Sequence, residues 1–187
     1  MNIRHTLGRV VAIAAAATGL AALGLTGVAS AGTGPAAVPA AASVATCTIQ
    51  AFDGHYLSAI DGGGRTTDVI ETNRFNPSTW ETFTMVKVND GAPGPHYGIM
   101  TSNRYWLTAV GGGGRDIDVI HSNAIVLQSW EKFTFVPVGG GWYGIQTIDG
   151  HYLTAVNSGG IGSSPEAIHS NATQIQAWEE FFISCHT

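Results

Sequence analysis

The sequence carries little charge, and most of the charge that it has is negative. Its 187 residues include eight Lys and Arg against 13 Asp and Glu. Basic residues do not cluster, so the sequence lacks the positive surface with which proteins bind nucleic acid or anionic lipid. We therefore expect a neutral, polar partner, and neither nucleic acid binding nor membrane insertion.

The sequence also lacks helical periodicity, and only one apolar run approaches the length of a membrane span. That run, residues 10–25, follows Arg4 and Arg9 and precedes the small-residue sequence Ala29-Ser30-Ala31. This order predicts a signal peptide over 1–31 rather than a membrane anchor, because a spanning helix needs about 20 apolar residues. We expect a secreted protein. Once the two arginines are removed, six basic and 13 acidic residues give a formal net charge of −7.

Cysteine is scarce, with one residue at position 47 and one at position 185. In an exported protein such a pair predicts a disulfide rather than two free thiols. Residues 32–46 are mostly Ala, Pro, Gly and Val without charge, which is typical of a flexible leader. The rest, 47–187, is long enough for one domain with a hydrophobic core.

Repetition is what the sequence has in abundance. The segment from Tyr56 to Phe83 recurs 50 residues later, and again 46 to 48 residues after that. Each copy contains an aromatic-Leu-Ser/Thr-Ala sequence, a glycine cluster, an Ile with an Asn three residues on, and a Trp-Glu-x-Phe sequence. The copies are expected to span about 47–94, 95–140 and 141–185.

Each copy predicts four short strands, with the glycine cluster as a hairpin turn between the second and the third. One copy cannot bury its apolar face alone, so the copies must share a core. Closure about a pseudo-threefold axis does this, whereas a propeller, the alternative, usually has four or more blades. The predicted fold class is all-β, a β-trefoil of twelve strands in three pseudo-symmetric repeats.

The repeated pattern resembles the fascin-like β-trefoil domains. The resemblance covers about 47–185 and rests on Tyr-Leu-Thr-Ala, the glycine turn, Val-x-x-x-Asn and Trp-Glu-x-Phe. Similar trefoil modules of secreted bacterial proteins bind carbohydrate, some through a Trp and a Glu of each repeat, so the resemblance implies a lectin-like protein with up to three sites. Actin bundling, the activity of fascin itself, is not expected of one small acidic domain. The Gln-x-Trp motif of ricin-type trefoils is not found at the fourth-strand positions, so that family is not assigned.

The Trp-Glu pairs are the candidate binding residues. Side chains alternate along a strand, so if Phe83, Phe133 and Phe181 face inward, the Trp residues face outward. An exposed indole offers a flat apolar surface to a sugar ring, and a carboxylate nearby accepts hydrogen bonds from sugar hydroxyls. In the alternative, each Trp packs on the barrel rim and each Glu holds a backbone N–H group. The candidate ligand-binding residues are Trp80, Glu81, Trp130, Glu131, Trp178 and Glu179.

No catalytic residue, metal site or cofactor is predicted. A glycoside hydrolase, the weaker alternative, needs two carboxylates about 5–10 Å apart, whereas the repeated Glu residues belong to separate copies. An interaction or inhibitor protein acting through the loop 89–95 is a second alternative.

The expected partner is a polysaccharide or a cell-surface glycan, and the protein is expected to bind it as a monomer. Equivalent histidines lie in different copies and are not expected to converge on a metal: His55 with His151, and His121 with His169.

Overall fold

A computed structural model describes residues 44–162 and 167–186, which lie in one compact unit of the chain, Thr33–Thr187. The predicted signal peptide and residues 32–43 of the predicted leader lie outside the described residues. Within the described ranges no helix combines the length and the apolar character needed to cross a membrane. All the strands of this part belong to one twelve-stranded sheet. The fold class predicted from the sequence, all-β, is therefore confirmed.

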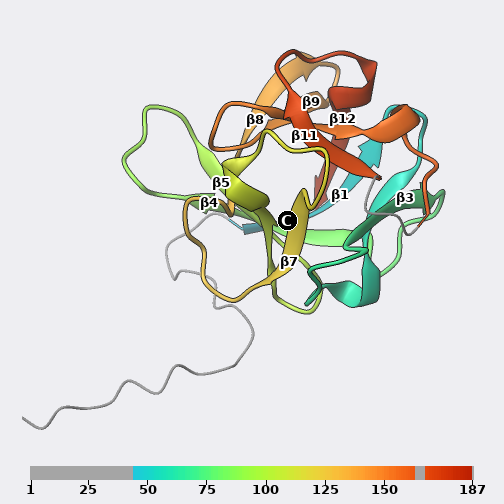
Figure 1. Ribbon diagram of the computed structural model, residues 1–187, viewed down its shortest axis with the longest axis horizontal. Helices are drawn as coiled ribbons and strands as arrows, with labels where there is room; N and C mark the ends of the chain where they lie inside the picture. Colours follow the sequence, from blue (N-terminus) through green and yellow to red (C-terminus); the bar gives the residue numbers. More distant parts are fainter. Residues whose placement is uncertain (1–43, 163–166, 187) are drawn as a thin grey trace, which may run out of the picture. The chain divides into compact units, whose positions relative to one another are not determined.

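The strands follow one another in the order that the repeats predict, four to each copy, and short 3₁₀ helices that were not predicted lie between some of them (Figure 1). The first strand begins at Val44, earlier than the predicted start of the domain, because Val44, Ala45 and Thr46 pair with β4. The elements are β1 (Val44–Ala51), β2 (Tyr56–Ala59), η1 (Ile60–Gly62), β3 (Ile70–Arg74), β4 (Thr82–Val88), β5 (His96–Met100), β6 (Trp106–Ala109), η2 (Val110–Gly112), β7 (Ile120–Ala124), β8 (Lys132–Gly139), β9 (Trp142–Gln146), β10 (Tyr152–Ala155), η3 (Val156–Ser158), β11 (Ile168–Ala172), η4 (Ala177–Glu179) and β12 (Glu180–His186).

Six of the strands close into a barrel. In sequence around the barrel, β1 pairs with β4, β4 with β5, β5 with β8, β8 with β9, β9 with β12, and β12 with β1. The other six strands form three antiparallel hairpins, β2–β3, β6–β7 and β10–β11. The three hairpins share one register, with Tyr56 opposite Arg74, Trp106 opposite Ala124, and Tyr152 opposite Ala172.

The predicted core is confirmed. The three Phe residues that follow the Trp-Glu pairs have no exposed surface, and the Leu of each second strand is 3% exposed. All six belong to a single hydrophobic cluster, to which Ile49, Ile99 and Ile145 also contribute. Burying a side chain of this kind stabilises the fold by about 1.5–3 kcal/mol. The core residues that the sequence predicted are Leu57, Leu107, Leu153, Phe83, Phe133 and Phe181.

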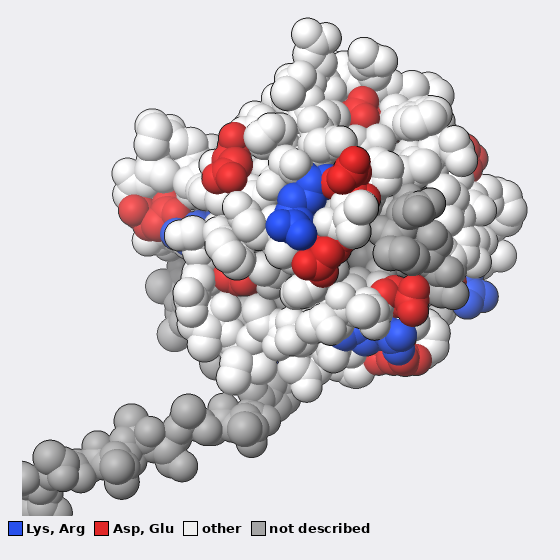
Figure 2. Space-filling view, viewed as in Figure 1, with Lys and Arg blue, Asp and Glu red and all other residues white. Residues whose placement is uncertain are grey.

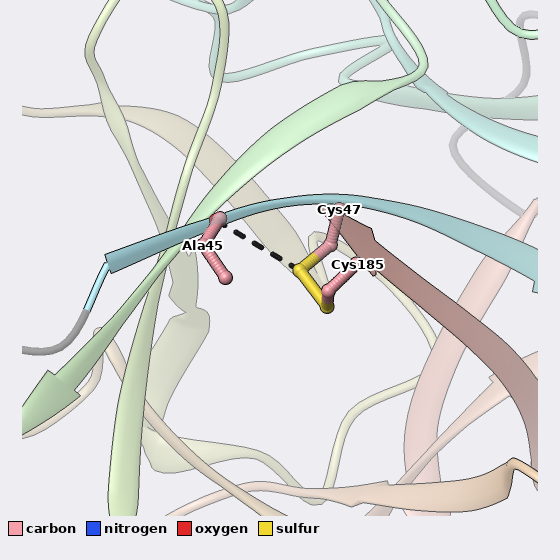
Figure 3. Close-up of a disulfide and its surroundings, with 3 residues drawn as sticks. All are labelled: Ala45, Cys47 and Cys185. Atoms are coloured by element: carbon pink, nitrogen blue, oxygen red, sulfur yellow. Dashed lines mark hydrogen bonds between the residues drawn. A yellow bond between two sulfur atoms is a disulfide. The ribbon is translucent and has the colours of Figure 1, made fainter. Parts of the chain in front are cut away.

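The predicted disulfide joins the first strand to the last. Cys47 of β1 and Cys185 of β12 are direct partners in the antiparallel ladder, and their Cα atoms lie 4.0 Å apart (Figure 3). The bond therefore closes the barrel covalently at the junction where the chain enters and leaves it. In the chain-entropy model, the 138-residue separation corresponds to about 4–5 kcal/mol of stabilisation.

The glycine clusters have a second role that the sequence did not predict: each one packs against the next copy. The backbone N–H of Asn103 donates to Gly62 O (3.0 Å), that of Asp149 to Gly112 O (3.3 Å), and that of Asp53 to Ser158 O (3.3 Å). The first copy thus contacts the second, the second the third, and the third the first. We call residues 62–65, 112–115 and 158–161 the glycine turns.

The same three turns also bond to the third strand of the next copy. Gly64 N donates to Ser122 O (2.6 Å), Gly114 N to Ser170 O (2.7 Å), and Gly160 N to Thr72 O (2.6 Å). A Cβ atom on Gly63, Gly113 or Gly159 would collide with Thr101, Thr147 or Asp53 of the facing turn. These glycines are required by the close approach as well as by their positive φ angles.

We expect Gly113→Ala to destabilise the domain by about 2–4 kcal/mol, since the new methyl group meets Thr147 and the residue has a φ of +120°. Gly94→Ala is the matched control, because nothing lies within 4 Å of its added Cβ atom and its φ is not in the positive range. Urea unfolding of both variants and the wild type gives the comparison. Equal stability of Gly113→Ala and Gly94→Ala would contradict the proposed contact.

Candidate functional site

The tryptophans of the Trp-Glu pairs lie just before the fourth strand of each copy and are exposed. Their exposed fractions are 37% for Trp80, 49% for Trp130 and 44% for Trp178, whereas the Phe three residues later is fully buried in every copy. The alternation predicted from the sequence is therefore confirmed. Each indole keeps enough surface in contact with solvent to receive a ligand.

In the first two copies, the backbone at the Trp is fixed by the second strand of the same copy. Ala59 N donates to Trp80 O at 2.9 Å, and Ala109 N donates to Trp130 O at 2.8 Å. These two alanines are the last residues of β2 and β6, and they are fully buried. The exposed rings are thus attached to a rigid part of the fold, which limits the entropy that a ligand would have to remove on binding.

The glutamates behave differently from the tryptophans beside them, because all three are buried. Glu81, Glu131 and Glu179 are 2%, 6% and 7% exposed. Glu131 Oε2 accepts a hydrogen bond from Gln128 N (2.8 Å), and its Oε1 accepts one from Thr108 Oγ1 (2.8 Å). The carboxylates therefore bind the backbone and hydroxyl groups of the protein itself.

The third copy repeats this arrangement, and the first copy varies it. Glu179 accepts from Gln176 N (3.0 Å) and Thr154 Oγ1 (2.7 Å). Glu81 accepts from both the backbone N and the Oγ of Ser78, each at 2.7 Å. Ser58, at the position of the two threonines, is buried and makes no hydrogen bond of normal geometry within the described residues. Each Glu closes the turn that carries its neighbouring Trp.

The pKa of Glu81 lies below its ordinary value. Burial by itself raises the pKa, but the nearby hydroxyls of Ser58 and Ser78 and the backbone N–H of Ser78 together lower it by more. Glu81 is therefore ionised at neutral pH, and its negative charge strengthens the hydrogen bonds that it accepts from Ser78 within the turn.

A shallow cavity lies beside each exposed Trp. The cavities measure about 390 Å³ at Trp80, 270 Å³ at Trp130 and 260 Å³ at Trp178. The turn before each Trp supplies the other walls, with Gln128 and Ser129 in the second copy and Gln176 and Ala177 in the third. The first cavity is also lined by Arg74 and Asn76, which were not among the predicted site residues. The sequence does carry a signal for them, because the equivalent positions of the other two copies hold different residues. The six residues predicted from the sequence therefore line three separate cavities, one Trp-Glu pair in each.

The Gln residues of these turns correct one statement of the sequence analysis. Gln128-Ser129-Trp130 and Gln176-Ala177-Trp178 do have the Gln-x-Trp spacing, directly before β8 and β12. The first copy has Ser78 in place of Gln. The motif ends at the Trp, before the fourth strand begins at Lys132 and at Glu180. In this structure the backbone N–H of each Gln donates to the buried Glu, which is a structural role.

Several of the remaining charged groups pair with one another at the surface, among them Arg65 with Asp61 and Arg115 with Asp118. Figure 2 shows acidic and basic side chains next to each other on the face in view, without a patch of one sign. In the loop 89–95, Asp90 Oδ2 accepts from Lys132 Nζ and lies the same distance, 2.8 Å, from His96 Nδ1, and these two hydrogen bonds hold the pKa of Asp90 far below its usual range. Among the described residues, His, Cys, Asp and Glu form no group of three that could hold a metal ion.

We expect Glu81→Gln to destabilise the domain by about 1–3 kcal/mol at pH 7, because the Ser78 donors lose a charged acceptor. The pKa of Glu81 is lowered in the folded state, so its contribution is present above the ordinary value of 4.5 and is lost as the pH falls through the folded-state pKa. Unfolding curves from pH 7 to pH 3 should show the wild type losing stability faster than the variant. Parallel curves for the two proteins would show that Glu81 titrates normally.

Comparison with known proteins supports the architecture. No protein-family model and no curated protein sequence matches the chain. Among solved structures, it is similar to the designed protein ThreeFoil (TM-score 0.62, 11% identity, 74% of this chain and 96% of the other). It is also similar to the BEL β-trefoil (TM-score 0.60, 10% identity, 80% of this chain and 97% of the other). A third similar structure is the Rhizoctonia solani agglutinin (TM-score 0.56, 14% identity, 78% of this chain and 98% of the other). Together with the six-stranded barrel and its hairpins, these likenesses show that the chain forms a β-trefoil domain.

Proposed function

We propose that this protein binds carbohydrate at up to three sites, each centred on Trp80, Trp130 or Trp178. The observation that carries the proposal is that an exposed indole recurs in each copy, with a cavity beside it and a buried Glu behind it. A merely structural Trp would be expected to be covered, since large aromatic side chains are highly buried on average. The structural likeness to an agglutinin gives the proposal further support.

In this proposal the indole supplies the main contact. The apolar face of a pyranose ring, with its C–H groups, stacks on the exposed ring, and the polar side chains of the turn bind the hydroxyl groups. Glu81, Glu131 and Glu179 act as positioning residues, because protein donors already occupy their carboxylates. They fix the turn so that the indole keeps one orientation.

Three equivalent sites would suit a repetitive ligand. When several weak sites bind one polymer, the second and third contacts form at high effective concentration, and overall affinity rises. The proposed partner is therefore a polysaccharide or a cell-surface glycan, bound by a secreted monomer whose domain begins at Val44. The disulfide fits this setting, because such bonds persist outside the cytoplasm.

A Trp→Ala series tests the sites. A single change at Trp80, Trp130 or Trp178 should weaken binding to an insoluble polysaccharide modestly, and the triple change should abolish it while the circular dichroism spectrum is kept. A glycan array identifies the polysaccharide to use. Trp142→Ala is the matched control, since this half-buried Trp lies on β9, outside the three turns. Unchanged binding by the triple variant would refute the proposed sites.

We also expect the protein not to cleave the glycan that it binds. General acid and base catalysis by carboxylates needs two of them at one site, and each cavity is lined by one Glu whose oxygens bind protein donors. Incubation with the bound polysaccharide should therefore release no reducing sugar. Release that a single Glu→Gln change removes would show that the protein is a hydrolase.

A further inference from the structure

The three proposed sites are not chemically identical, and the difference lies at one position of the third strand. Residue 74 is Arg in the first copy, whereas the residues with the same pairing register in the other copies are Ala124 and Ala172. Arg74 lines the cavity beside Trp80. No charged side chain except the buried Glu lines the cavity of Trp130 or Trp178.

The guanidinium group of Arg74 is accessible and only partly used. Its Nη2 donates to Glu71 Oε1 at 3.2 Å, and the side chain of Arg74 is 52% exposed while that of Glu71 is 10% exposed. A guanidinium carries five N–H donors in a planar fork, so a single contact leaves donors for a second acceptor. Two parallel donors of this fork match the two oxygens of a carboxylate.

The acidic groups near this cavity do not oppose an incoming anion strongly. Glu71 is paired with Arg74 itself, and Glu81 is 2% exposed with its charge bound by the Ser78 donors. Of the charged side chains that line the cavity, Arg74 is therefore the one that faces solvent. The cavity is also larger than the other two, at about 390 Å³ against 270 and 260 Å³, which leaves room for a substituent beside the sugar ring.

We infer that the site at Trp80 binds a sugar that carries a carboxylate, such as a uronic acid, whereas the sites at Trp130 and Trp178 bind neutral sugars. The sugar ring stacks on the indole of Trp80, and its carboxylate accepts two hydrogen bonds from Arg74. This inference rests on the proposed function, since it assigns a ligand class to one of the proposed sites. The protein would then recognise a glycan in which acidic and neutral residues occur together.

The test compares paired sugars that differ only at carbon 6. Methyl glucuronide is titrated against methyl glucoside, and methyl galacturonide against methyl galactoside, while the indole N–H signals of the ¹⁵N-labelled protein are followed by NMR. At Trp80 we expect the preferred uronide to bind about tenfold more tightly than its neutral partner, the effect of one charge-assisted contact. The preference should shrink in 0.5 M NaCl. Trp106, 1% exposed, is the internal control whose signal should not move.

Two variants exchange the chemistry of the sites. Arg74→Ala gives the first site the residue of the other two, so the uronide should lose its advantage at Trp80 and bind about as tightly as its neutral partner. Ala124→Arg should create a uronide preference at Trp130. Because this second variant leaves Arg74 and Glu71 intact, it tests the inference even if Arg74→Ala is unstable.

The outcomes separate the two proposals. If the neutral sugars shift all three exposed Trp signals and the uronides bind Trp80 no more tightly, the inference about Arg74 is wrong and carbohydrate binding stands. If none of the four sugars shifts Trp80, Trp130 or Trp178, the proposed function is wrong, and the inference fails with it. A uronide preference at Trp80 that survives in Arg74→Ala would also overturn the assignment to Arg74.

Discussion

The contact on which this structure depends is the docking of each glycine turn onto the next copy of the repeat. Backbone bonds such as Asn103 N to Gly62 O and Gly64 N to Ser122 O join one copy to the next, and the third copy contacts the first in the same way. Because the turns have no Cβ at the tightest points, two backbones approach closely enough to bond directly. Each copy thereby obtains from a neighbour the hydrogen-bond partners that it cannot supply itself.

The proposed binding turns depend on the same elements. The second strand of each copy runs directly into its glycine turn, and this strand also holds the Trp-bearing turn. In the second copy, Ala109 N bonds to Trp130 O, while Thr108 bonds to the carboxylate of Glu131. A buried carboxylate with two donors resists displacement, because leaving those donors unpaired costs about 1–3 kcal/mol each. The exposed indole is therefore presented by a short, well-fixed turn rather than by a long loop.

Much of the fold could be predicted from the sequence, since the pattern repeats. The Leu and Phe residues of the core follow from strand alternation, which also places Trp80 outward, and the disulfide follows from two cysteines near the ends of the repeated region. What could not be predicted is the partner that each group finds. Alternation shows that Glu81 faces the opposite way from Trp80, but not that Ser78 would bind its carboxylate. A glycine cluster predicts a turn, but not that Gly113 would meet Thr147.

The position of the disulfide has a consequence for what a protease would leave of the domain. Cys47 and Cys185 enclose nearly the whole described domain, so one cleavage anywhere between them produces two fragments that remain covalently joined. The exposed loop 89–95, which carries Gly and Pro, is an obvious place for such a cut. The strands on its two sides, β4 and β5, would still be paired with each other and with β1 and β8. A nicked molecule would keep the three exposed tryptophans on one particle, and with them the proposed multivalent contact with a polymer.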